Sequence, residues 1–246
     1  MAEYPAIRGI KGNYNYTAYL PYYPTKFEVS EDLQTIRKVI WNFKDGAVSK
    51  EVAEMLANPF SQDTADCSPR NNWWLCVIPA STLIKTQDRF QQFCEEFCRL
   101  TGFNNGYNLI TNTDDREAKH LEENRNSVNI LEHVAFRDIK GKNIVLFDDV
   151  YTTGKSFLNI ANKLSQLGAT QIKGLFLGKT HWLNDDGSIN TGFIASSAGT
   201  HEQDDYDLEY EPDYDDDGDS PYANYTYEDS LNDLLDGDMD AYWNID

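Results

Sequence analysis

The sequence predicts an α/β fold in which helices flank a parallel sheet, followed by an acidic C-terminal tail. Three apolar runs, at residues 73–78, 144–147 and 171–177, are typical of buried parallel strands. Segments with apolar residues at helical spacing lie before the first run and between the others. Because strands that alternate with amphipathic helices form parallel sheets covered by helices, this order indicates the α/β class.

The helices around the first strand can be placed from their start and stop residues. One begins after Ser30, a favoured N-cap residue, and carries apolar residues at helical spacing: Leu33, Ile36, Ile40 and Phe43. A shorter helix is expected at residues 49–57, because Pro59 follows closely. The next helix covers residues 87–100, and a short strand is expected at residues 107–110.

Composition divides the chain into an aromatic N-terminal segment (1–28), a main domain (29–200) and an acidic tail (201–246). The N-terminal segment is rich in tyrosine, and residues 13–16 alternate as a strand does. We expect these rings to pack against the main domain. The alternative is that they stack on a base.

Residues 142–156 are predicted to form the functional centre of the chain. The strand at 144–147 is followed by Asp148 and Asp149, and then by a polar loop: Thr152, Thr153, Gly154, Lys155 and Ser156. A helix follows, whose inward residues are Phe157, Ile160, Ala161, Leu164 and Leu167. The first N–H groups of a helix lack partners and its dipole favours negative charge, so the loop predicts an anion site. Carboxylates beside it can accept hydrogen bonds from sugar hydroxyls, which favours a sugar phosphate as ligand.

This stretch has two other possible interpretations. The Gly-Lys-Ser sequence at 154–156 suggests a Walker A nucleotide loop, but that motif needs a glycine where Asp149 stands. An ordinary strand–turn–helix with capping residues would explain Thr152 or Thr153. It would not explain two adjacent carboxylates at the end of an apolar strand, so the sugar-phosphate interpretation is favoured.

The stretch resembles the phosphoribosyl-pyrophosphate (PRPP) motif of type I phosphoribosyltransferases. That motif has four apolar residues, two acids, an apolar residue, a variable residue and then Thr-Thr/Ala-Gly-x-Thr/Ser. The chain matches it from Ile144 to Ser156. The resemblance implies a type I phosphoribosyltransferase-like fold, with Asp148 and Asp149 as catalytic residues that hold the ribose 2′- and 3′-hydroxyls. It also implies that the loop holds the 5′-phosphate through Thr152, Thr153, Gly154, Lys155 and Ser156.

The resemblance extends to two loops that precede the central stretch. The residues after the strand at 73–78 match the family's pyrophosphate loop, with two basic residues downstream: Ala80, Ser81, Thr82, Lys85 and Arg89. For the two basic residues, a solvated surface charge is an equal alternative. Residues 111–129 occupy the place of the family's flexible hood loop, where Lys119, His120 and Arg125 are candidate phosphate contacts. The alternative there is an ordinary solvated loop.

Within the family, the chain most resembles the competence protein F (ComF) group, over roughly residues 30–181. Shared features are the Lys-Asp-Gly sequence at 44–46, the Lys-Gly-Lys sequence at 140–142 and the Asp-Asp-Val-Tyr-Thr-Thr-Gly core at 148–154. Two departures stand out. The zinc ribbon of four cysteines that is usual in that group is absent from the N-terminus, and the group's Arg-Gly-Phe-Asn-Gln run is only partly matched at residues 88–92.

The resemblance implies that PRPP, bound with Mg²⁺, reacts with a nitrogenous base and releases pyrophosphate. Magnesium would be held through PRPP rather than by direct protein ligands. Thr152 stands where enzymes for 6-oxopurines carry Asp, which disfavours a hypoxanthine-guanine role and leaves a pyrimidine-type base open. A homodimer is also left open. The alternatives are a non-catalytic PRPP- or nucleotide-sensing module that acts through a protein partner, and a scaffold with a vestigial site.

Negative charge is concentrated in the tail, which holds 18 of the 41 acidic residues and no Lys or Arg, and so accounts for most of the net charge of −20. This composition favours a disordered, solvating tail. Leucines spaced as on a helix within residues 227–240 offer an alternative, which is docking into a protein partner. A third interpretation is mimicry of nucleic-acid charge. Direct nucleic-acid binding by the tail is opposed by its own charge.

Membrane insertion and a disulfide framework are not expected. The chain has no apolar run long enough for a transmembrane helix, and its first residues lack a signal-peptide pattern, so we expect a cytoplasmic protein. Cys94 and Cys98 lie one helical turn apart in an apolar pattern, which favours core packing over zinc binding. No Cys-x-x-Cys pair is present.

Overall fold

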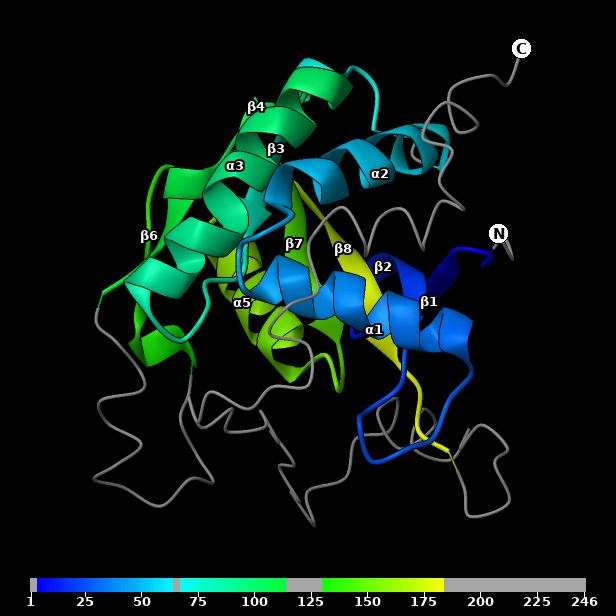
Figure 1. The fold of residues 1–246 in the computed structure, drawn as a ribbon. Coiled ribbons are helices and arrows are strands. Elements are labelled where there is room, and N and C mark those ends of the chain that lie inside the picture. Colours follow the sequence, from blue (N-terminus) through cyan, green and yellow to red (C-terminus); the bar gives the residue numbers. More distant parts are fainter. Residues whose placement is uncertain (1–3, 64–66, 114–129, 184–246) are drawn as a thin grey trace.

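The structure, a computed structural model, describes residues 4–63, 67–113 and 130–183 (Figure 1). Its centre is a six-stranded sheet with the strand order β1-β2-β8-β7-β3-β4. The strands are β1 (Ile7–Lys11), β2 (Tyr14–Tyr22), β3 (Trp73–Val77), β4 (Asn104–Asn105), β7 (Asn143–Tyr151) and β8 (Gln171–Thr180). Apart from the antiparallel hairpin β1–β2, every neighbouring pair in this sheet is parallel. The predicted α/β class with a mostly parallel sheet is therefore confirmed.

Helices cover both faces of the sheet (Figure 1). Helices α1 (Glu31–Lys44), α2 (Ser49–Asp63) and α3 (Leu83–Thr101) pack on one face, and α5 (Lys155–Gln166) packs on the other. Strand β7 is buried on both faces, because Val145 and Phe147 belong to the first core while Ile144 and Leu146 belong to the second. Burial on both sides explains why this strand is a continuous apolar run rather than an alternating one.

The parallel strands end together at one edge of the sheet. In the register of the ladders, Val77 pairs with Phe147, Tyr151 with Lys179, and Tyr22 with Thr180. The loops that leave β3, β7, β8 and β2 therefore emerge at the same edge. Ligands of parallel α/β sheets bind outside the carboxyl ends of the strands, so this edge is where a site is expected.

The N-terminal segment contributes to the same sheet. Strand β2 inserts between β1 and β8, and the ring of Tyr16 is buried and stacks on that of Tyr151 with 4.1 Å between centroids. This tyrosine packs against the main body, as expected. A second, smaller sheet pairs β5 (Ile110–Asn112) with β6 (Val134–Phe136). Three short 3-10 helices complete the described elements: η1 (Arg70–Asn72), η2 (Tyr107–Leu109) and η3 (Ile130–Glu132).

The second helix corrects a prediction, because α2 runs to Asp63 with Pro59 inside it. Proline was expected to end the helix, since it lacks an N–H and clashes with the preceding turn. Packing of the residue after the proline offsets much of that cost here. Phe60 is 2% exposed, and its ring lies against those of Phe97 and Phe103 with centroids 5.4 and 5.7 Å away. Burial of one large aromatic side chain contributes about 2 kcal/mol, which helps the helix to continue.

Other element boundaries also differ from the predictions. The strand predicted at 107–110 is wrong, because residues Tyr107–Leu109 form η2 and the strand follows it as β5. Helix α3 begins four residues earlier than expected, because Thr82 caps it. Leu167 lies just past the end of α5 and is 37% exposed, whereas the sequence placed it inward. The sequence also suggests a short strand at residues 192–195, which lie outside the described residues.

The described cysteines and helices bear on two further expectations. Cys67, Cys76, Cys94 and Cys98 are all buried and unbridged. Burial raises the pKa of the Cys98 thiol to about 12, so this side chain packs as an uncharged apolar group. Among the helices that the structure describes, none is both long enough and apolar enough to cross a membrane.

Candidate functional site

Two neighbouring strand–loop–helix units build the candidate site at the carboxyl edge of the sheet. One runs from β3 to α3 and the other from β7 to α5. The N–H of Ile78 donates to the carbonyl of Phe147 at 2.9 Å, so the loop that follows β3 starts beside Asp148. The two loops predicted from sequence to bind pyrophosphate and ribose phosphate are thus adjacent in space.

The two consecutive carboxylates have different surroundings. Asp148 is half-buried, and its Oδ1 accepts a bond from the N–H of Asp149 at 2.9 Å. Among the described residues its other carboxylate oxygen has no hydrogen-bond donor. Burial, together with the negative charge of Asp149, raises the pKa of Asp148 well above its usual value. Asp148 is therefore the less well-satisfied carboxylate of the two.

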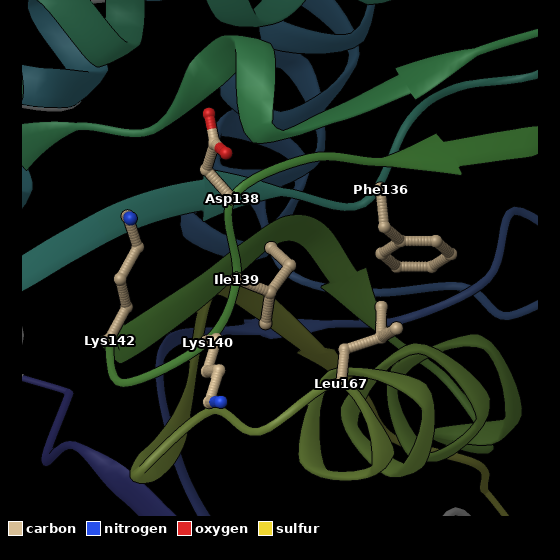
Figure 2. A pocket seen from close by; sticks show the side chains of 6 residues that line it. All are labelled: Phe136, Asp138, Ile139, Lys140, Lys142 and Leu167. Atoms are coloured by element: carbon tan, nitrogen blue, oxygen red, sulfur yellow. The ribbon is translucent and has the colours of Figure 1, made fainter.

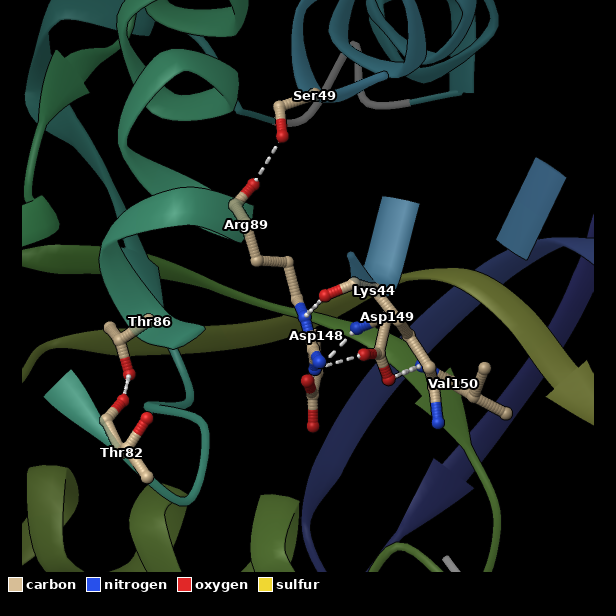
Figure 3. A network of polar contacts seen from close by, with 8 residues as sticks. All are labelled: Lys44, Ser49, Thr82, Thr86, Arg89, Asp148, Asp149 and Val150. Carbon is tan, nitrogen blue, oxygen red and sulfur yellow. Dashed lines mark hydrogen bonds and ion pairs between the residues drawn. The ribbon is translucent and has the colours of Figure 1, made fainter. Parts of the chain in front are cut away.

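Asp149, by contrast, is 6% exposed and held at both oxygens (Figure 3). Its Oδ1 accepts a bond from the N–H of Val150 at 2.6 Å, and its Oδ2 accepts one from Nη1 of Arg89 at 2.5 Å. Arg89 also donates from Nε to the carbonyl of Lys44 at 2.9 Å. Arg89 was assigned by resemblance to the pyrophosphate site, and the structure places its guanidinium against Asp149.

The loop between β7 and α5 opens that helix without a capping side chain. Gly154 is the N-cap residue and has the left-handed φ of 74°, which glycine adopts without strain. A side chain at Gly154 would overlap the hydroxyl of Tyr151, which lies directly against it. Thr153 accepts a bond from the N–H of Lys155 at 3.3 Å, and the hydroxyls of Thr152 and Thr180 lie 3.2 Å apart. The exposed threonines and the first turn of α5 together present hydroxyl and N–H donors to an anion.

The loop between β3 and α3 is more completely bonded within the protein. Thr82 caps α3 by accepting a bond from the N–H of Lys85 at 3.1 Å. Asn112 of β5 donates to the carbonyl of Ala80 at 2.8 Å and also accepts a bond from the hydroxyl of Thr86. Asn112 was not singled out from the sequence. Only the fold brings the end of β5 to this loop, so no sequence signal could have found it.

Two more residues at this edge, Lys179 and His181, were not predicted from the sequence. Lys179 is 8% exposed and donates to the hydroxyl of Tyr16 at 2.8 Å, with the ring of Tyr151 5.7 Å from its ammonium. His181 follows β8, and its ring stacks on Tyr23 with 5.4 Å between centroids. Burial and the charge of Lys179 lower the pKa of His181, which favours a neutral imidazole. Sequence patterns alone do not predict that a lysine near the end of a strand will be buried.

The structure therefore gathers most of the proposed site residues and leaves some apart. Those at the shared edge are Ala80, Ser81, Thr82, Arg89, Asp148, Asp149, Thr152, Thr153, Gly154, Lys155 and Ser156. Lys85 lies in the exposed first turn of α3. The three hood-loop candidates Lys119, His120 and Arg125 lie outside the described residues.

A surface hollow of about 490 Å³ lies elsewhere on the molecule (Figure 2). It is lined by Phe136, Asp138, Ile139, Lys140, Lys142 and Leu167. Lys142 immediately precedes β7, whereas Asp148 lies near the other end of that strand. The hollow is thus at the amino edge of the sheet, away from the carboxylates, and it is not part of the candidate site.

No protein-family model matches this chain. Among curated proteins, the ribose-phosphate pyrophosphokinase of Thermococcus kodakarensis is 35% identical to it over 74 residues. That match covers 30% of this chain and 25% of the other protein, so the chain spans about a quarter of the length of the curated relative it matches.

Solved structures with a similar arrangement are phosphoribosyltransferases. The purine phosphoribosyltransferase from Pyrococcus horikoshii is 16% identical, with 65% of this chain and 87% of that chain covered and a TM-score of 0.29. The hypoxanthine phosphoribosyltransferase of Trypanosoma cruzi is 16% identical, with 59% and 67% covered and a TM-score of 0.31. The hypoxanthine-guanine phosphoribosyltransferase from Schistosoma mansoni, in complex with IMP, is 11% identical, with 55% and 65% covered and a TM-score of 0.31. Likeness at this level gives no information on substrate or activity.

Proposed function

We propose that this protein binds PRPP with Mg²⁺ at the carboxyl edge of its sheet and transfers the phosphoribosyl group to a nitrogenous base. In this reaction the bond between the anomeric carbon and the pyrophosphate oxygen breaks. A carbon–nitrogen bond to the base forms on the same carbon, and pyrophosphate leaves. Transfer of this kind depends mainly on positioning the reactants and on placing charge around them.

One observation carries the proposal: two carboxylates lie next to the N-terminus of a helix whose N-cap residue is a glycine, and a second loop lies beside them. Asp148 and Asp149 precede the loop to α5 directly, and residues 80–82 lie next to Asp148. Ribose hydroxyls would bond to the carboxylates, the 5′-phosphate to the loop at 152–156, and the diphosphate to residues 80–82 with Lys85. The segment shared with a ribose-phosphate pyrophosphokinase supports ribose phosphate as the class of ligand.

The residues of the site fit magnesium that arrives with PRPP. Among the described residues, no three acidic, histidine or cysteine side chains converge to form a metal cage. Mg²⁺ commonly binds through substrate phosphates with few protein ligands, so such a cage is not required. Asp148, one of whose carboxylate oxygens has no donor among the described residues, would accept a hydrogen bond from a water held by that ion. The bound ion would offset negative charge on the departing pyrophosphate.

The proposal also covers the acceptor base, the cellular compartment and the role of the tail. Thr152, the first residue of the loop, stands where enzymes for 6-oxopurines carry Asp, so a 6-oxopurine acceptor is disfavoured. The sequence features shared with the ComF group support a function related to that group. Lys119, His120 and Arg125, which lie outside the described residues, are proposed as further phosphate contacts. Four buried, unbridged cysteines suit a reducing cytoplasm. Recruitment of a protein partner by residues 201–246 belongs to the alternative of a sensor, and a homodimer is compatible with either function.

Calorimetric titration of PRPP with Mg²⁺ into the full chain tests the site, with the double variant Asp148→Asn/Asp149→Asn as its control. We expect saturable binding to the wild type and none to the double variant. A coupled assay for pyrophosphate, run with a panel of pyrimidine and purine bases, then tests turnover. Absence of PRPP binding by the folded wild type contradicts the proposal.

The same pair of assays separates the enzyme from the alternative of a sensor. Saturable PRPP binding without pyrophosphate release for any base would favour a non-catalytic module that acts through its tail.

A further inference from the structure

Arg89 joins three elements around the candidate site. Its side chain is only 12% exposed. It donates from Nε to the carbonyl of Lys44 at the end of α1, and from Nη1 to Asp149 on β7. Its own carbonyl accepts a bond from the buried hydroxyl of Ser49 at the start of α2, at 2.8 Å. Two of the three guanidinium nitrogens are therefore already bonded within the protein.

These contacts make the two adjacent carboxylates unequal. Asp149 turns toward α1 and α3 and is fixed at both oxygens, by Arg89 and by the N–H of Val150. Asp148 accepts one backbone bond and keeps an oxygen without a donor among the described residues. An ionised carboxylate has about four acceptor positions, so the oxygen without a donor is the better acceptor for a ligand hydroxyl.

We infer that Arg89 is a positioning residue for the ribose half of the site: it fixes Asp149 and leaves Asp148 to take the ribose hydroxyls. Arg89 is thus assigned to position Asp149, and no longer to contact pyrophosphate directly as the resemblance implied. It deepens the proposed function and rests on it for the identity of the ligand. A guanidinium suits the task, because its planar fork can bond a carbonyl and a carboxylate at once, whereas a lysine ammonium has no such fixed geometry.

Two separate probes distinguish positioning from direct contact. Ribose 5-phosphate samples the ribose half of the site, and magnesium pyrophosphate samples the other half. Arg89→Gln should weaken ribose 5-phosphate by about tenfold or more and change the affinity for magnesium pyrophosphate by less than about twofold. The opposite result, in which pyrophosphate binding falls and ribose 5-phosphate binding is kept, overturns the inference. Arg89→Lys should give an intermediate loss for ribose 5-phosphate.

Matched variants separate positioning from loss of stability. Ser49→Ala removes the bond to the backbone carbonyl of Arg89 and should lower Tm while keeping the ribose 5-phosphate affinity. Arg99→Gln removes a charge from the same helix, where Arg99 pairs with Glu96 on the surface, and should change neither affinity. If Ser49→Ala weakens ribose 5-phosphate as much as Arg89→Gln does, the effect is a general loosening of the fold and the inference fails.

A readout without ligand distinguishes failure of this inference from failure of the proposed function. Tm is measured for Arg89→Gln, Asp149→Asn and the double variant. If Arg89 fixes Asp149, the loss in the double variant should be clearly smaller than the sum of the two single losses. Additive losses overturn the inference whatever the ligand. If the wild type binds neither probe while the losses are non-additive, the proposed ligand is wrong and the fixation of Asp149 stands.

Discussion

The units β3–α3 and β7–α5 are neighbours, and the N-termini of their helices lie at the same edge of the sheet. The two helices differ in how their N-termini are capped. Helix α3 is capped by the hydroxyl of Thr82, which accepts a bond from the helix's own first turn. Helix α5 has Gly154 at the same position, with no side-chain cap. The N-cap side chain of α3 therefore binds one of the first N–H groups of its own helix, whereas α5 has no N-cap side chain and the N–H of Lys155 bonds to the hydroxyl of Thr153 in the preceding loop at 3.3 Å.

The two units also differ in whether carboxylates lie at the end of the strand. Strand β7 continues through Asp148 and Asp149 before its loop, while β3 ends at the apolar Val77 and is followed by Ile78. The second unit thus offers anion donors and carboxylate acceptors within a few residues, which is what a phosphorylated sugar needs. The first unit contributes Arg89, whose guanidinium crosses to the second unit and holds Asp149. The comparison teaches that one unit presents the chemistry and the other supports it.

The largest expected effect comes from giving α5 a side chain at its N-cap. Gly154→Ala should lose about 2–3 kcal/mol of unfolding free energy, from left-handed strain and from overlap with Tyr151, and should abolish PRPP binding. Gly141→Ala is the matched control, because Gly141 has a φ of 77° with open space around it. It should lose about 1 kcal/mol and keep the affinity. Equal losses in urea denaturation for the two variants would show that the contact with Tyr151 has no part in the effect.

A smaller effect is expected at the cap of α3. Thr82→Ala removes the hydroxyl that bonds the N–H of Lys85 and should lower the unfolding free energy by about 1 kcal/mol. Thr82→Ser keeps an acceptor there and should stay close to the wild type. Denaturant midpoints for the two variants test this. If Thr82→Ala is as stable as Thr82→Ser, the contrast between a capped and an uncapped unit is wrong.

The smallest effect concerns pH and Asp148. Because the pKa of Asp148 is raised in the folded chain, the folded state binds more protons than the unfolded state between the usual Asp value of about 4 and the raised value. The stability of the ligand-free protein should therefore fall as pH rises through that window. The charges that act on Asp148 are those of Asp149, which raises its pKa, and of Arg89 and Lys44, which lower it.

Asp148→Asn tests this dependence, since it removes the titrating group. The variant should lose this part of the pH slope and be at least as stable as the wild type near neutral pH. Thermal denaturation across the acidic range, with both proteins in the same buffers, supplies the measurement. An unchanged slope in the variant would mean that another group is responsible.

The sequence alone determined the α/β class, the strand that carries the acids and the loop that follows it. These depend on local patterns: an apolar run of strand length, two adjacent acids, and a glycine that opens an amphipathic helix. It also indicated that residues 80–82 and 148–156 lie close together, because parallel strands end at a common edge. Element ends were less accurate, since Pro59 and η2 depend on packing with distant residues.

Only the tertiary structure decided how the two carboxylates differ. Arg89 and Asp149 are 60 residues apart, and Asn112 and Lys179 reach the edge from other strands, so no local pattern connects them. Side-chain pairing across elements depends on the order of strands and on which face each residue occupies. A one-residue change of register would reverse that face, and the sequence does not specify register at this precision. The division of roles between Asp148 and Asp149 is therefore a property of the fold.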